Sequence, residues 1–325
     1  MQKQPLILFA LAVLCVRVAA QEKAFELTGV IRAKYEYNTQ LDASRFQVRN
    51  ARLYFTGATS PVFSYKAEID LSDEGQIKML NAYIDLNANE SLALRLGQMK
   101  VPFSTDYLRS PYAQHFANRS FISKQMTSGM RDVGAQLRWK GSIGLPASAD
   151  IAIFNGEGLY NQSVWETEMN YSARMAMDLP AGFSWSANYY SALPNTAGFR
   201  FNYVDLGLQY EVGRFHIEAE YLLKQYEPDS IADTKGFLVT ALYTQPLPER
   251  CFFTSITPLL RYDGMGGNVR YNLAEDAARN RWSAGVNLNI KPWSSYVRLN
   301  YEKYVYKNAA LNQDDKWVLE FVAHF

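Results

Sequence analysis

Apolar and polar residues alternate along most of this chain with a period of two. In the segment FELTGVIRAKYEY (25–37), every second residue is apolar or glycine, and most residues between them are polar or charged. The alternation recurs in FSYKAEIDLS, VDLGLQYEV, FHIEAEYLL, RWSAGVNLNI and the closing KWVLEFVAHF. Because successive side chains of a strand point to opposite faces of a sheet, this pattern predicts strands with one apolar and one polar face.

Sixteen segments of this kind can be identified along the chain. Their centres lie near residues 31, 51, 66, 82, 96, 136, 152, 173, 187, 207, 220, 241, 259, 286, 299 and 321. The alternation is weakest near 51, 187 and 259. Strands of about ten residues suit a tilted membrane crossing, and an even number suits a single-chain barrel.

The links between these segments alternate in length. Most even-numbered segments end in tight links such as TSP, NANE, LPAG, VGR and KPW, with QPLPERCFFT as the exception. Long polar links follow the odd-numbered segments, at 38–44, 72–75, 103–130, 156–167, 191–198, 227–234, 263–280 and 307–315. A β-sandwich, the soluble alternative, has no reason to sort its loops in this way. We therefore predict an all-β transmembrane antiparallel barrel of about sixteen strands, with short periplasmic turns and longer extracellular loops.

The two ends of the chain also fit an exported barrel. Residues 1–20 combine Lys3, an apolar run and the small residues of Val18-Ala19-Ala20, which is the layout of a cleaved secretory signal peptide. Residues 21–325 would then form one barrel domain in the outer membrane of a Gram-negative cell. Closure would pair the first strand with the last, because lipid offers no partner to an open sheet edge. The barrel-assembly machinery is expected to recognise the alternating C-terminal residues Trp317, Leu319, Phe321 and Phe325.

Composition narrows the possible functions. The chain has 325 residues, is 48% hydrophobic and carries a net charge of +1, which excludes a generally basic nucleic-acid binder. After signal cleavage Cys251 is the only cysteine, so no internal disulfide is expected. The three histidines, His115, His216 and His324, are expected at different heights in the barrel, which leaves no nucleophile–histidine pair. The sequence thus predicts no enzyme, no catalytic residue, no metal site and no cofactor.

Several segments carry a resemblance to a known family. The most specific are FQVRNARLYFTGATSPVFSYKAEIDLS and LNAYIDLNANESLALRLGQMKVPF, within 46–103, and RDVGAQL, AIFNGEG and FHIEAEYLLKQY continue it. These segments resemble the phosphate-selective porin O and P family, and more specifically its members from Bacteroidetes-type bacteria. The resemblance implies a sixteen-stranded outer-membrane barrel with a water-filled pore, usually assembled as a homotrimer.

The function expected from this resemblance is passive diffusion of small hydrophilic solutes, with a mild preference for anions such as phosphate. The partners would be outer-membrane lipid, the solutes, the barrel-assembly machinery and further copies of the chain, without nucleic acid. The alternative is a barrel closed at its lumen that acts as a surface-binding or structural protein. Most loops are small for a plug domain or a large binding surface, which favours the open pore.

Residues opposite the apolar stripe are expected to face the lumen. Basic and acidic residues are mixed there, and no basic run is as dense as the arginine and lysine ladder of the phosphate-selective members. For any single charge, the simplest interpretation is a solvated side chain paired across strands. The predicted lumen wall includes Arg32, Lys34, Lys66, Glu68, Asp70, Arg95, Arg138, Arg174, Glu218, Glu220 and Arg298.

The longest link, residues 103–130, is the third on the long-loop side. In general porins the third loop folds into the barrel and narrows it. This link contains one acidic residue, Asp106, and a basic constriction would favour anions, because charges in a narrow pore set its selectivity. In the alternative interpretation the loop packs through its aromatic residues Tyr107, Tyr112, Phe116 and Phe121, and its charges are merely solvated. The residues predicted to form the constriction are Arg109, His115, Arg119, Lys124 and Arg131.

Overall fold

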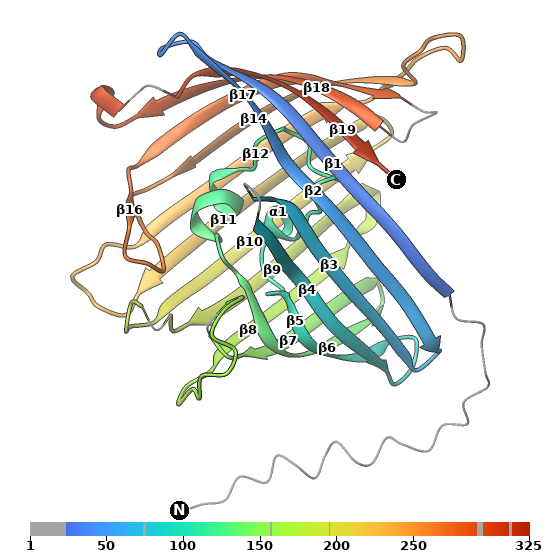
Figure 1. The fold of residues 1–325 in the computed structure, drawn as a ribbon, viewed down its shortest axis with the longest axis vertical. Coiled ribbons are helices and arrows are strands. Elements are labelled where there is room, and N and C mark those ends of the chain that lie inside the picture. Colours follow the sequence, from blue (N-terminus) through green and yellow to red (C-terminus); the bar gives the residue numbers. More distant parts are fainter. Residues whose placement is uncertain (1–23, 74–75, 157, 195, 291–294, 312–313) are drawn as a thin grey trace, which may run out of the picture.

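The computed structural model describes residues 24–73, 76–156, 158–194, 196–290, 295–311 and 314–325. These residues form one closed antiparallel β-barrel (Figure 1). The predicted signal peptide, residues 1–20, lies outside the described residues. Within the described ranges, no helix is both long enough and apolar enough to cross a membrane.

In this described part of the chain, the sheet holds seventeen strand segments. The two-residue segment β13 (Gln245–Pro246) continues β12, because both pair with β14. Sixteen described strands therefore surround the lumen. They are β1 (Ala24–Asn38), β2 (Ala43–Ser60), β3 (Phe63–Asp73), β4 (Gln76–Asn87), β5 (Leu92–Lys100), β6 (Arg131–Ser142), β7 (Pro146–Phe154), β8 (Asn170–Asp178), β9 (Phe183–Ala192), β10 (Phe201–Val212), β11 (Phe215–Tyr226), β12 (Thr234–Tyr243), β14 (Ser255–Met265), β17 (Arg279–Ile290), β18 (Ser295–Tyr306) and β19 (Lys316–His324). Each predicted strand centre falls within one of them, which confirms the predicted fold.

The barrel closes between its first and last strands. β1 pairs antiparallel with β19, from Val30 opposite His324 to Asn38 opposite Lys316. Phe325 extends this ladder by exchanging two backbone hydrogen bonds with Gly29. The Phe325 ring also covers Gly29, where an added Cβ would come within 2.5 Å of a ring carbon. The first and last strands thus satisfy each other's backbone groups, as a sheet in lipid requires.

The links sort by length as the sequence predicts, with two exceptions. The link between β1 and β2 shortens to residues 39–42, and β4 begins soon after β3 ends, because these strands run further than predicted. The short turns at the opposite end include residues 61–62, 88–91, 143–145, 179–182 and 213–214. The turn at 179–182 holds the 3-10 helix η2 (Pro180–Gly182). The longer links hold α1 (Thr105–Leu108), η1 (Ile122–Met126), η4 (Ala309–Leu311) and a small hairpin of β15 (Asn268–Val269) and β16 (Glu275–Asp276).

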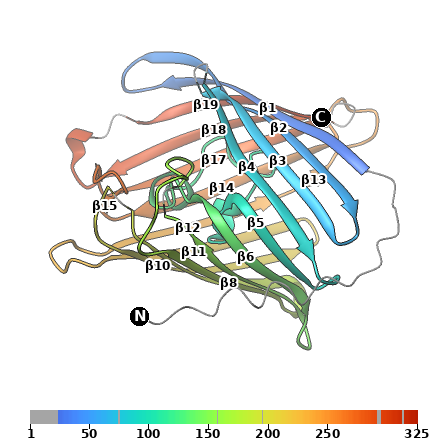
Figure 2. The same ribbon diagram turned by 60° about the horizontal axis from the view of Figure 1, so that its bottom comes forward.

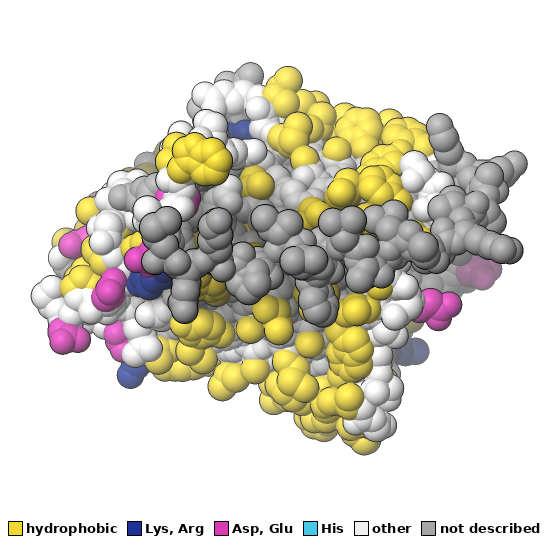
Figure 3. Space-filling view, turned by 90° about the horizontal axis from the view of Figure 1, so that it is seen from below, with side chains coloured by type: hydrophobic (Ala, Val, Ile, Leu, Met, Phe, Trp, Pro, Cys, Tyr) yellow, Lys and Arg dark blue, Asp and Glu magenta, His cyan; other side chains and the backbone are white. Residues whose placement is uncertain are grey.

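The outer surface is apolar across the middle of the strands. On β10, Val204, Leu206 and Leu208 point outward with exposed fractions of 40%, 56% and 48%. Figure 3 shows hydrophobic side chains over much of the visible barrel surface and charged side chains towards its ends. Aromatic pairs flank this band. The rings of Tyr262 and Trp282 lie 4.3 Å apart near the long loops, and those of Phe183 and Tyr210 lie 4.4 Å apart near the short turns. An apolar band between two aromatic girdles suits a bilayer.

The third loop, residues 101–130, lies inside the barrel. Figures 1 and 2 both show this green segment between the strand walls, with α1 surrounded by them. Phe103, Ile122 and Met126 of the loop join one buried apolar cluster with inward side chains of the wall, among them Tyr203 and Leu222. The inner face of the barrel is therefore not polar throughout, because the loop gives part of the wall apolar partners.

A β-bulge in β2 changes which residues face the lumen. Arg32 of β1 lies opposite Asn50, whereas the next residue, Ala33, lies opposite Val48, so that Arg49 is the extra residue. On one side of the bulge Arg45 and Arg49 line a lumen cavity, and beyond it the inward positions have the opposite parity. The bulge explains why the alternation near residue 51 is weak.

Candidate pore constriction

The backbone of the third loop is hydrogen-bonded to the opposite wall of the barrel. The Phe121 amide donates to Asp263 of β14 at 2.9 Å, and the Ala117 amide donates to Asn300 of β18 at 2.9 Å. Arg32 of β1 donates to the Ala117 carbonyl at 2.6 Å. Because a loop buried inside a barrel leaves its amides and carbonyls without water, such bonds determine its path.

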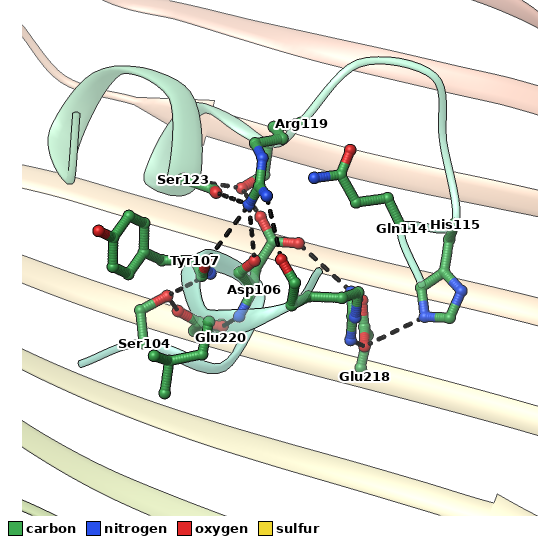
Figure 4. A network of polar contacts seen from close by, with 12 residues as sticks. Ser104, Asp106, Tyr107, Gln114, His115, Arg119, Ser123, Glu218 and Glu220 are labelled. Carbon is green, nitrogen blue, oxygen red and sulfur yellow. Dashed lines mark hydrogen bonds and ion pairs between the residues drawn. The ribbon is translucent and has the colours of Figure 1, made fainter. Parts of the chain in front are cut away.

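The first turn of α1 is fastened to β11. Ser104 caps this turn by accepting a hydrogen bond from the Tyr107 amide at 3.1 Å, and its hydroxyl donates to Glu220. The Asp106 amide donates to the other oxygen of Glu220 at 3.0 Å. The Ser120 hydroxyl in turn donates to the Asp106 carboxylate at 2.5 Å, which ties the two halves of the loop together. Figure 4 shows this network above β11.

Two of the predicted constriction residues are turned towards the β11 wall. Arg109 donates hydrogen bonds to both oxygens of Glu218, with an Nη1–Oε1 distance of 3.0 Å. This bidentate geometry is the one in which arginine binds carboxylates well. His115 Nε2 lies 3.6 Å from Oε2 of the same carboxylate. Arg109 therefore fastens the loop to the wall, and His115 lies beside this ion pair.

Arg119 and Lys124 face a cavity in the lumen. The Arg119 guanidinium donates to the carbonyls of the loop, including that of Arg109 at 3.0 Å, and to the Ser123 hydroxyl at 2.8 Å. Burial is the main cause that lowers the pKa of Arg119 to about 9, so that the group is still charged at neutral pH. The fifth predicted residue, Arg131, lies apart at the start of β6, with Nη2 3.6 Å from Glu68.

The cavity beside Arg119 and Lys124 has a volume of about 410 Å³ and lies at the long-loop end of the lumen. Among its lining residues, which belong to the described part of the chain, nine are basic and three, Glu36, Asp276 and Asp314, are acidic. The basic residues of this cavity come from separate segments, namely the third loop, both ends of the chain, β17 and the link before it. For this reason they do not form a dense basic run in the sequence. The basic residues are Lys34, Arg45, Arg49, Arg119, Lys124, Arg270, Arg279, Arg281 and Lys316.

A second cavity of about 280 Å³ is lined by other parts of the wall and by Leu108, Ser110 and Pro111 of the loop. The predicted wall residues Lys66, Glu68, Arg95 and Arg138 line it, together with Arg52, Lys100 and Asp150. Lys100 Nζ donates to the Tyr107 carbonyl at 2.7 Å. Arg49 and Arg52 both lie on β2, and Arg49 lines the cavity of about 410 Å³ whereas Arg52 lines the cavity of about 280 Å³.

The remaining predicted wall residues also lie on the inner face. Arg32 and Arg298 share the buried carboxylate of Glu320, at 2.8 Å and 2.6 Å. Arg174, Glu218 and Glu220 line a third cavity of about 150 Å³ beside α1. Asp70 accepts from Arg52 at 2.8 Å, and Lys34 donates to Glu36 at 2.7 Å and to Asn118 of the loop at 3.0 Å.

The prediction that the three histidines lie at different heights is wrong for two of them. The rings of His115 and His216 have their centroids 5.2 Å apart, because the third loop descends far enough to reach the start of β11. The His324 ring instead lies 4.3 Å from Tyr112. The aromatic packing expected of the loop occurs at Phe116 and Phe121, which are 2% and 3% exposed.

The four residues of the predicted C-terminal assembly signal point outward. Trp317, Leu319, Phe321 and Phe325 have exposed fractions of 47%, 48%, 41% and 57%. Their neighbours Val318, Glu320 and Val322 are fully buried on the inner face. The last strand therefore presents a continuous apolar stripe on the lipid side of the seam.

Comparison with known proteins agrees with this architecture. Residues 25–182 match the sequence model of a family described as phosphate-selective porin O and P, which confirms the family resemblance over these residues. No curated protein sequence matches the chain.

Solved structures of outer-membrane proteins are similar in fold. The outer membrane channel DcaP of Acinetobacter baumannii has a TM-score of 0.66 at 14% identity, covering 95% of this chain and 100% of that one. Salmonella typhi OmpF, in complex with daunomycin, has a TM-score of 0.65 at 17% identity, covering 93% and 97%. Vibrio cholerae OmpT, in its trimer form, has a TM-score of 0.64 at 10% identity, covering 93% and 99%. At these identities the similarity establishes the barrel fold.

Proposed function

We propose that this chain, whose residues 25–182 belong to the phosphate-selective porin O and P family, is an outer-membrane porin through which small hydrophilic anions diffuse. The apolar band around the barrel supports its place in the outer membrane. The observation that carries the anion preference is the lumen cavity of about 410 Å³, which is lined by nine basic and three acidic side chains of the described residues. Charges on the wall of a narrow aqueous passage determine which ions enter it.

The acidic residues of the opposite wall do not cancel this charge. Glu218 is bound by Arg109, and Asp263 accepts from Arg281 at 2.9 Å and 3.1 Å. Both carboxylates are almost completely buried beneath the loop. A charge that is paired and covered contributes little to the potential in the water-filled part of the lumen. For the same reason Arg281, the buried partner of Asp263, adds little to the positive charge of the cavity.

Anions would pass the third loop along β2. Arg49 lines the cavity of about 410 Å³, and Arg52 lines the cavity of about 280 Å³. The two side chains lie on the same wall, and the Arg119 guanidinium of the loop faces the first cavity. Arg52 pairs with Glu68 at 2.9 Å and with Asp70 at 2.8 Å, so the net positive charge comes mainly from Arg49 and Arg119 at the level of the first cavity.

Planar-bilayer recording of the refolded protein in a salt gradient tests the proposal. The expected result is a step-like conductance with a reversal potential on the anion side. A reversal potential on the cation side would overturn the anion preference, although it would leave the porin function intact.

The second candidate function is a barrel closed at its lumen that binds at the cell surface or has a structural role. The packing of the loop against Tyr203 and Leu222 inside the barrel favours it, because this packing fills part of the lumen. Liposome swelling with sugars of graded size distinguishes the two functions. Swelling with the smallest sugars is expected, and a folded barrel that gives no swelling would support the closed form.

We also propose that the chain assembles as a homotrimer after export. The family resemblance and the trimer form of Vibrio cholerae OmpT support this proposal. Light scattering of the protein in detergent should give three chains per particle. Mass spectrometry of the mature protein should place its first residue at Gln21 if the signal peptide is cleaved as predicted.

The C-terminal aromatic stripe is proposed as the signal for the barrel-assembly machinery. Deleting Phe325 removes the two backbone hydrogen bonds to Gly29 and the outward ring. The amount of heat-modifiable barrel in the outer membrane should fall strongly, while the conductance of barrels that do form should stay unchanged. Equal amounts of folded wild-type and truncated protein would contradict this role.

A further inference from the structure

Two imidazoles and a carboxylate converge where the third loop meets β11. His115 comes from the loop, and His216 and Glu218 come from β11, with the possible ligand atoms all within 4.8 Å of one another. The Glu218 Oε2 atom lies 3.3 Å from His216 Nε2 and 3.6 Å from His115 Nε2. Figure 4 shows the His115 ring directed at the Glu218 carboxylate. Ligands of a tetrahedral ion with bonds of about 2.0–2.1 Å lie roughly 3.3 Å apart. The two distances to Glu218 fit this spacing, whereas the two imidazole nitrogens, which lie within 4.8 Å of each other, would have to move closer together to bind one ion.

One ligand atom of this cluster has no other role in the described structure. His115 Nε2 is buried and has no hydrogen-bond partner among the described residues. A buried polar atom without a partner destabilises a protein by about 1–3 kcal/mol. A neutral imidazole nitrogen in this position offers a lone pair, which is the form in which histidine binds metals.

The other two ligands are oriented by neighbouring side chains. Carboxylates face both ring nitrogens of His216, because Nδ1 lies 3.8 Å from Glu211 and Nε2 lies 3.3 Å from Glu218. Arg109 donates to Oε1 of Glu218 at 3.0 Å and also contacts Oε2, so that the carboxylate is held in one orientation. Partners of this kind around the ligands are common in metal sites.

We propose that His115, His216 and Glu218 bind one divalent metal ion of the Zn²⁺ class, which fastens the third loop to β11. Two imidazole nitrogens and one carboxylate oxygen suit Zn²⁺, whereas Ca²⁺ and Mg²⁺ prefer oxygen ligands alone. Water would complete the tetrahedron. The ion would join a residue of the loop to two residues of the wall, and would therefore limit movement of the loop within the lumen.

A bound ion would also add positive charge inside the barrel. Glu218 lines both the cavity of about 150 Å³ beside α1 and a small space that includes Arg119. Binding of Zn²⁺ should therefore move the reversal potential further to the anion side. This consequence rests on the proposed porin function, whereas metal binding itself does not.

Metal binding can be measured on the refolded protein in detergent. Cys251 is an exposed thiol, so the measurements use a Cys251→Ser background to remove a competing ligand. Calorimetric titration with Zn²⁺ should give one site per chain, and Co²⁺ should give the intense visible absorption of a tetrahedral complex. His115→Ala and His216→Ala should each weaken binding by at least about tenfold. His324→Ala is the matched control, because the third histidine lies outside the cluster, and it should leave binding unchanged.

The variants also separate loss of the site from loss of the fold. Heat-modifiable migration shows that each His variant still forms a barrel, and the two His→Ala changes leave the Arg109–Glu218 pair intact. Equal affinity in wild type and in folded His115→Ala or His216→Ala protein would overturn the proposal, as would an absence of saturable binding to the wild type.

Single-channel recording then tests the consequence for selectivity. Added Zn²⁺ should shift the reversal potential of the wild type and of His324→Ala, but not that of His115→Ala. Saturable binding without such a shift would overturn the effect on selectivity alone. A barrel that binds Zn²⁺ in detergent but conducts no ions would contradict the porin function and leave the metal site standing.

Discussion

The two sides of the lumen carry their charges in different ways. On β11 and β14, the carboxylates Glu218, Glu220 and Asp263 are buried beneath the third loop. On β2, Arg45 and Arg49 line a cavity that stays open beside the same loop. A count of inward charges along the sequence treats both sides alike. Only the position of the loop determines which charges reach the water.

The chemistry of the loop explains why acids lie on the covered side. A loop inside a barrel brings buried amides and guanidinium groups with it, and these need acceptors. Glu220 accepts from the Asp106 amide and Asp263 accepts from the Phe121 amide, while Glu218 accepts from Arg109. Carboxylates thus serve to hold the loop, and the basic side chains of β2 are left for the solute path.

Removing an acid from the covered side should have the largest effect. Asp263 is completely buried, accepts from the Phe121 amide and lies against Arg261 and Arg281 at 3.3 Å and 2.9 Å. Asp263→Ala removes the carboxylate from both guanidinium groups, although Arg281 keeps Glu302 at 3.3 Å. Breaking a buried pair costs about 3–5 kcal/mol. Urea unfolding in detergent, followed by tryptophan fluorescence, measures this loss.

The matched control for Asp263→Ala lies on the open side. The Arg45 side chain is 64% exposed and pairs with Glu36, and a surface ion pair contributes about 0–1 kcal/mol. Arg45→Ala should therefore change the free energy of unfolding only slightly. Similar costs for the two variants would mean that the loop does not cover β14 in solution.

The outer face of the covered wall should tolerate charge less well than its inner face. Leu206 of β10 points outward and is 56% exposed, whereas Gln209 of the same strand lines the cavity of about 150 Å³. Leu206→Arg should cost roughly 2–4 kcal/mol if the residue lies near the bilayer midplane. Gln209→Arg should cost much less, because water reaches its side chain. Unfolding in lipid vesicles measures both, and equal costs would contradict the assignment of faces.

The strand order and the seam could be predicted from the sequence because alternation is a local property. Trp282, Val286 and Leu288 all point outward because their side-chain direction follows from position along the strand alone. The bulge at Arg49 is an exception, since one extra residue exchanges the inward and outward positions of the β2 residues before it. Arg45 and Arg49 were missed for this reason.

The covered wall could not be predicted, because it depends on contacts between segments far apart in the sequence. Leu222 and Leu238 face inward and are 0% and 2% exposed, although lumen positions are expected to be polar. The run YLL in β11, which is apolar on both faces, was the available signal that something covers the inner side. The approach of His115 to His216 has no local signal, because it depends on how far the loop descends.

On the open side, removing one charge should weaken the anion preference. A unit charge about 5 Å from an ion in water contributes about 0.8 kcal/mol, which is roughly a fourfold change in local concentration. Arg49→Ala should therefore lower the anion-to-cation permeability ratio by up to about fourfold at low salt, and by less at high salt. Lys307→Ala, in an exposed link outside the lumen cavities, should leave the ratio unchanged. An unchanged ratio in Arg49→Ala would place the ion path away from β2.

The smallest expected effect is a change of selectivity with pH at Lys124. Burial, followed by the charges of Arg49, Arg270 and Arg119, lowers the pKa of Lys124 below that of an ordinary lysine. Its positive charge is present below this lowered pKa and is lost as the pH rises through it. The anion preference of the wild type should therefore begin to decline at a pH below the usual lysine pKa of about 10.4.

Lys124→Arg keeps a positive charge at every accessible pH, so its reversal potential should change less with pH than that of the wild type. Lys34 and Lys316 line the same cavity, so the decline should be smaller in this variant rather than absent. Recordings at stepwise increasing pH measure the difference, with Lys307→Arg as the control that should follow the wild type. If Lys124→Arg declines with pH as the wild type does, Lys124 does not act on the permeating ion. The contribution of the third loop to selectivity would then come from Arg119, together with the arginines of β2.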